Sequence, residues 1–179
     1  MRSRAWLCAP LLLQAAALAH QAPNSVVSLD FAAGVVRAEM FVPVSELAAT
    51  SAARGTVATG AYLLSHVSME TPAGERWSVD LVNLRRMSAD GHDYWVARLD
   101  FIPPAGASAR ELVFIDDAIT HEVRNHVVTV LARSDTAATP AVAGPELLGV
   151  LQYPARSLTI RRPDQNSHWK PNDGSSGSQ

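Results

Sequence analysis

Polar and apolar residues alternate along much of this chain, which is the pattern of strands that bury one face. In the segment 35–43, VVRAEMFVP, the charged residues Arg37 and Glu39 alternate with apolar side chains. A β-rich segment at 25–31 precedes it, and Gly34 supplies a turn between the two. We therefore predict a β-hairpin over residues 25–43, with one apolar face directed to a core.

The pattern changes after this hairpin and then returns to strands. Residues 43–47 predict a turn into a short helix, and residues 57–66 predict a second short helix. Further strands, separated by turn residues, are predicted at 67–70, 77–87, 94–102, 111–117, 126–133, 147–153 and 157–161. Short strands at this spacing predict a mostly β fold: an antiparallel β-sandwich of the immunoglobulin-like or Greek-key type, with one or two short helices near residues 44–66.

The first residues have the pattern of a secretory signal peptide. Arg2 and Arg4 precede an apolar run from 5 to 18, which ends in Ala-Leu-Ala at 17–19. The run is shorter than the ~20 residues of a membrane-spanning helix, and a small-x-small cleavage pattern closes it. We expect cleavage after residue 19 and a periplasmic or secreted protein; an uncleaved anchor is the alternative.

These patterns divide the chain into three parts. Residues 1–19 are the expected signal peptide, and residues 20–162 are the expected β-sandwich domain. Residues 163–179 lose all periodicity and end in Gly, Ser and Gln, so we predict a disordered polar tail. No other apolar segment approaches the length of a membrane span, so none is expected after cleavage.

Composition narrows the possible functions. The chain of 179 residues has a formal net charge of −2, which gives no support for nucleic-acid binding. Its single cysteine, Cys8, lies within the expected signal peptide, so the exported domain must be stable without disulfides. No nucleophile elbow, phosphate-binding loop or dinucleotide motif is present, and we expect a protein that is not an enzyme.

Several segments resemble one family of membrane proteins. They are AHQAPNSVVSLDF at 19–31, FVPVSELA at 41–48, PPAGAS at 103–108, ITHEVRNHVVTVLARSD at 119–135 and PELLGVLQ at 145–152. Together they resemble the extracytoplasmic N-terminal domain of HupE/UreJ-type proteins, which are associated with hydrogenase and urease accessory functions and with nickel or cobalt movement. The resemblance covers roughly residues 20–169 and implies a shared domain and compartment. The transmembrane helices that follow in the family have no counterpart here, so the resemblance transfers no permease activity.

Histidines are the candidate metal ligands. Cleavage after residue 19 would place the ring and the α-amine of His20 on one terminal residue, which suits copper in a histidine brace; alternatively, His20 only frays in solvent. His121 and His126 are five residues apart, so only a turn at 124–125 could bring their rings together; alternatively, they flank a bend without sharing an ion.

Carboxylates near these histidines are candidate supporting groups. Asp117 and Glu122 could orient an imidazole or contribute an oxygen, although such residues more often end a strand in solvent. His66, His92 and His168 are dispersed and are interpreted as surface residues rather than ligands.

The sequence thus predicts an exported, non-enzymatic binding or accessory module. It is linked to the handling of a divalent metal, nickel or cobalt, at a membrane, with a membrane protein as a possible partner. His20, His121 and His126 are the candidate ligands, and nickel or copper is the candidate ion. Two alternatives stay open: a metal-free protein-interaction domain of a membrane complex, and a copper histidine-brace protein.

Overall fold

A computed structural model describes residues 23–52, 55–108, 110–133 and 145–162 of the chain. The expected signal peptide and polar tail, together with His20 and His168, lie outside these residues. The described strands are β1 (Ser25–Ala32), β2 (Val35–Pro43), β3 (Val67–Glu70), β4 (Ser78–Ala89), β5 (His92–Ile102), β6 (Glu111–Asp116), β7 (Val127–Ala132), β8 (Glu146–Gln152) and β9 (Ser157–Arg161). The described helices are α1 (Val44–Leu47) and α2 (Thr56–His66).

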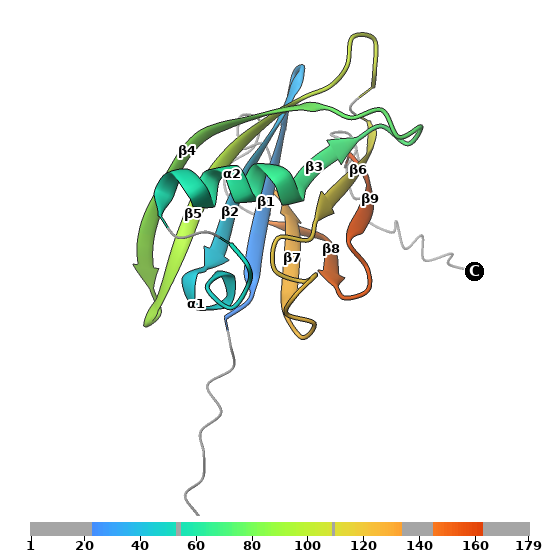
Figure 1. The fold of residues 1–179 in the computed structure, drawn as a ribbon. Coiled ribbons are helices and arrows are strands. Elements are labelled where there is room, and N and C mark those ends of the chain that lie inside the picture. The colour runs from blue at the N-terminus through green and yellow to red at the C-terminus, as the bar shows by residue number, and fades with distance from the viewer. Residues whose placement is uncertain (1–22, 53–54, 109, 134–144, 163–179) are drawn as a thin grey trace, which may run out of the picture.

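Six of these strands form the larger sheet, in the order β4-β5-β2-β1-β7-β8 (Figure 1). The predicted hairpin is β1–β2, and buried and partly exposed residues alternate strictly along β1. Gly34 lies at its turn with φ +74°, a left-handed conformation that glycine adopts without strain. All neighbouring strands of this sheet are antiparallel except β1 and β7, which run parallel.

The second layer consists of a small sheet and a helix. The small sheet has the order β3-β6-β9, and Figure 1 shows α2 lying across one face of the larger sheet and running directly into β3. Gly60 in α2 permits the close approach to β4, because a Cβ atom there would lie only 2.8 Å from Leu81 Cδ2. Phe101 of the larger sheet and Phe114 of the small sheet meet edge to face, with ring centroids 6.5 Å apart. The apolar core therefore lies between the two layers.

The fold class predicted from the sequence is confirmed. The protein is mostly β, with two sheets arranged as in a β-sandwich and two helices within residues 44–66. Trp77 and Trp95 belong to the apolar core and are 3 % and 6 % exposed. Within the described ranges, none of the helices has the length and apolar character needed to cross a membrane.

Candidate metal site

Two residues of the candidate site face each other because of how β3 and β6 pair. The last register pair of this antiparallel ladder is Val67 with Asp116. His66 and Asp117 are one step further along, and the Asp117 N–H donates to the His66 carbonyl over 3.3 Å. The side chains continue this pairing, since His66 Nδ1 lies 2.8 Å from Asp117 Oδ1.

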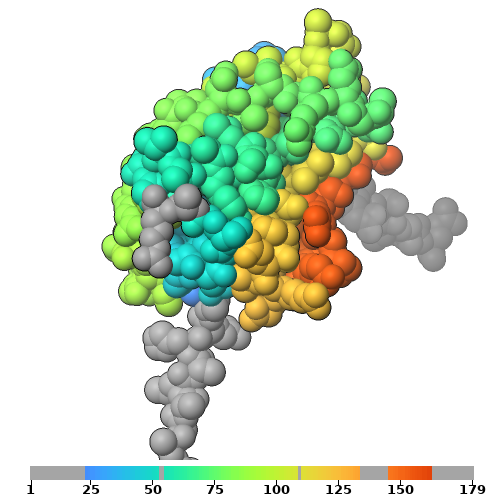
Figure 2. All heavy atoms as spheres, in the orientation of Figure 1, coloured from blue at the N-terminus to red at the C-terminus, as the bar shows by residue number. Residues whose placement is uncertain are grey.

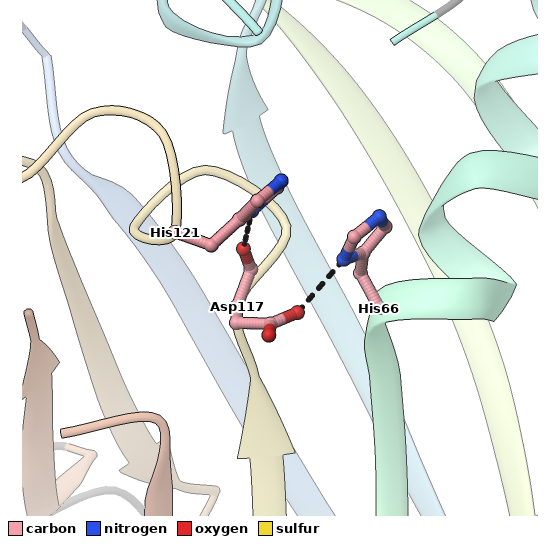
Figure 3. Close-up of side chains that lie close together, drawn as sticks. All are labelled: His66, Asp117 and His121. Carbon is pink, nitrogen blue, oxygen red and sulfur yellow. Dashed lines mark hydrogen bonds and ion pairs between the residues drawn. The ribbon is translucent and has the colours of Figure 1, made fainter. Parts of the chain in front are cut away.

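The third residue, His121, comes from the turn that follows β6. Its backbone N–H donates to the Asp117 carbonyl over 3.4 Å, and its ring Nδ1 donates to the same oxygen. The His121 ring stacks on the His66 ring, with centroids 4.6 Å apart and planes inclined by 15°. The two imidazole rings therefore lie nearly parallel and close together, as Figure 3 shows.

Together these three side chains form a compact group of potential ligands. One donor atom from each of His66, Asp117 and His121 lies within 4.8 Å of the other two. The side chains of His66 and Asp117 are 24 % and 19 % exposed, and that of His121 is 20 % exposed. The group is thus partly shielded but open to an ion from solvent. In Figure 2 the green atoms of α2 and β3 abut the yellow and orange atoms of the chain from β6 to β7, so the segments that carry the group are in contact on this face.

Neighbouring side chains hold the group from two sides. The Tyr62 ring packs on His66 with centroids 4.3 Å apart, and its hydroxyl donates to the Ala118 carbonyl over 2.9 Å. Opposite, Arg156 Nη1 lies 3.4 Å from Asp117 Oδ2. Arg156 directly precedes β9, and its carbonyl accepts a hydrogen bond from the Asp116 N–H, so β9 continues the small sheet up to the site.

Glu122 adds a second carboxylate at the far nitrogen of His121. Glu122 Oε1 lies 3.0 Å from His121 Nε2. The Ser51 hydroxyl and backbone N–H donate to the same carboxylate, and these hydrogen bonds hold the pKa of Glu122 below its usual value. Both His121 nitrogens therefore face acceptors, so a metal ion bound at Nε2 would lie beside a negative charge.

The donor types suit a borderline transition metal. Imidazole nitrogen with carboxylate oxygen is a donor set used by zinc, copper, iron and nickel, whereas calcium and magnesium prefer oxygen alone. The 2.8 Å between His66 Nδ1 and Asp117 Oδ1 is close to the ~3 Å that separates two donors each about 2.1 Å from one ion. The residues present therefore fit such an ion.

Asp116 and Asp117 are adjacent, but Asp116 is the last residue of β6 and Asp117 lies just beyond the strand. Asp116 is 2 % exposed, and burial raises its pKa to about 7, opposed by the hydrogen bond from the Ala118 N–H. Only Asp117 faces the histidines. The acidic pair thus contributes one carboxylate to the site and one to the interior.

His126 lies away from this group, in a separate buried contact. Its Nε2 is 2.9 Å from Ser25 Oγ, and its Nδ1 is 3.6 Å from Glu46 Oε2. The atom order is that of a serine–histidine–acid set. Ser25 and His126 are only 3 % and 2 % exposed, however, so the hydroxyl has no access to a substrate in this fold.

The structure thus brings together Asp117, His121 and Glu122 from the sequence-predicted residues, but it adds His66 and not His126. The interpretation of His66 as an isolated surface residue is corrected, since its ring is packed between Tyr62 and His121. The sequence feature that could have drawn attention to His66 is its position directly before a predicted strand. The register that sets it opposite Asp117 is a long-range property that one sequence does not reveal.

No model of a protein family matches the chain, and no curated protein matches it.

Proposed function

We propose that this protein is an exported, non-enzymatic accessory domain that captures a divalent transition-metal ion, with nickel or cobalt as the first candidates. The observation that carries the proposal is the group formed by His66, Asp117 and His121, whose donor atoms lie within 4.8 Å of one another. Three donors that already converge need little rearrangement to bind an ion, which lowers the entropic cost of binding.

The remaining parts of the proposal rest on the sequence. The signal-peptide pattern at 1–19 supports export, and the resemblance to the outer domain of HupE/UreJ-type proteins supports metal handling beside a membrane protein. In this proposal Glu122 assists by stabilising positive charge at His121 Nε2. His126 has a structural role, since its ring joins the start of β1 to the start of β7.

Calorimetric titration of the purified protein with Ni²⁺, Co²⁺, Cu²⁺ and Zn²⁺ tests the proposal. We expect binding at or below about 10 μM for at least one ion, weakened tenfold or more by His66→Ala and by His121→Ala. His92→Ala is the matched control, because His92 begins β5 and lies outside the group. Thermal unfolding of each variant checks that the fold is kept.

The same titration separates the alternatives. Copper binding lost only in His20→Ala would support the histidine brace instead. No binding tighter than about 10 μM by any of the four ions would overturn both metal proposals and leave the protein-interaction domain.

A further inference from the structure

Arg156 places a positive charge beside the Asp117 carboxylate, which is one of the groups that would bind the proposed ion. Its Nη1 lies 3.4 Å from Asp117 Oδ2, while Asp117 Oδ1 faces His66 Nδ1 at 2.8 Å. The two oxygens of this carboxylate are therefore shared between the Arg156 guanidinium group and the candidate ligand group.

The contacts on the two sides of Asp117 follow from the strand order of the small sheet. Asp117 directly follows its central strand, β6, which lies between β3 and β9. His66, directly before β3, lies opposite Asp117. Arg156, directly before β9, lies opposite Asp116 and reaches Asp117 with its side chain. The pairing of β6 with β9 thus places the backbone of Arg156 next to the site, and its exposed side chain makes the contact with Asp117.

We propose that Arg156 is a built-in competitor for the ion at Asp117: its guanidinium group pairs with the carboxylate in the ion-free protein and weakens the hold on a bound ion. This inference rests on the proposed function and deepens it. It makes the site one that binds and releases its ion, as a carrier requires, rather than one that retains a structural ion.

The opposite role for Arg156 would be to orient Asp117, and the geometry argues against it. The contact is long for a charge-assisted hydrogen bond, and the Arg156 side chain is 54 % exposed, so it fixes the carboxylate weakly. His66 and the backbone pairing already orient Asp117. Charge repulsion has the larger effect. A unit positive charge roughly 5 Å from a divalent ion weakens the binding of that ion by about tenfold even in water-like surroundings.

Arg156→Gln tests this role, because glutamine keeps a donor and removes the charge. Arg161→Gln is the matched control: Arg161 lies at the other end of β9 and pairs with Glu111 at 3.5 Å, away from the site. Ni²⁺ affinity is measured by calorimetry, and the Ni²⁺ dissociation rate is measured by stopped-flow transfer to excess EDTA. Thermal unfolding verifies that both variants are folded.

We expect Arg156→Gln to bind Ni²⁺ about tenfold more tightly and to release it correspondingly more slowly, with Arg161→Gln unchanged. Unchanged or weaker binding in Arg156→Gln, with binding intact in the unsubstituted protein, would overturn the competitor role and leave the proposed function standing. Binding by Arg156→Gln alone would support the competitor and overturn the proposed function. Binding by neither protein would overturn both.

Discussion

His66 Nδ1 and Asp117 Oδ1 lie 2.8 Å apart although the two residues are 51 positions apart in the sequence. The contact joins the end of α2 to the end of β6, and it exists because β3 and β6 pair with Val67 opposite Asp116. The candidate site is therefore a product of strand register. Its properties can be tested one residue at a time.

Asp117→Asn is expected to weaken metal binding by about 10- to 100-fold. Asparagine keeps nearly the same shape but removes the negative charge that faces His66 and Arg156. The measurement is calorimetric titration with Ni²⁺. Asp93→Asn is the control, because Asp93 lies in β5 and accepts from the exposed Ser88 hydroxyl. Equal affinities of Asp117→Asn and the unsubstituted protein would contradict the assignment of Asp117 to the site.

Added metal is expected to stabilise the folded protein. Because His66 and Asp117 meet only in the folded chain, an ion bound there stabilises the native state by about 2.7 kcal/mol at 100 times its Kd. Urea unfolding with and without Ni²⁺ measures the effect, and EDTA should reverse it. The same stabilisation in His66→Ala would show that the ion binds elsewhere.

His126 is expected to make stability depend on pH between about 6.5 and 4. Burial lowers the pKa of His126 to about 4, so the unfolded chain binds its proton first as the pH falls. The stability associated with the neutral His126 ring is fully present above pH 6.5. It is lost as the pH falls toward 4, and the loss in the free energy of unfolding reaches up to about 3 kcal/mol. Urea unfolding at intervals from pH 7.5 to 4.5 measures this loss.

The comparison protein for this measurement is His126→Asn, which lacks the titrating ring. Its stability should fall less over the same range, since only the remaining carboxylates and histidines contribute. Parallel curves for the two proteins would show that the buried ring does not titrate as expected. The carboxylate of Glu46, 3.6 Å from His126 Nδ1, would offset part of the loss if it pairs with the protonated ring.

Gly149→Ala is expected to destabilise the fold by about 1–2 kcal/mol. A Cβ atom at this position would lie 2.8 Å from both terminal methyl carbons of Leu158, where β8 of the larger sheet meets β9 of the small one. In a Leu158→Ala background the same substitution should cost less, which a double-mutant cycle in urea would measure. Additive effects would show that the two residues do not constrain each other.

The strands and helices were predictable because their signals are local. The alternation of polar and apolar residues is read within a few positions, and the predicted bounds of β2, β3 and β9 match those of the structure. At the site, Asp117 and His121 are four residues apart in one turn, and both were identified as candidates from the sequence. The missing partner, His66, was judged a surface residue.

What the sequence by itself determined is the set of elements and the faces they bury, since the period of the pattern depends only on neighbouring residues. The tertiary structure decided which ends of these strands and helices meet. It paired β1 with β7 in parallel, buried His126 against Ser25, and set His66 and Arg156 on either side of Asp117. These outcomes depend on strand order and register, which arise from the packing of the whole core. They produce no pattern between neighbouring residues, so one sequence does not reveal them.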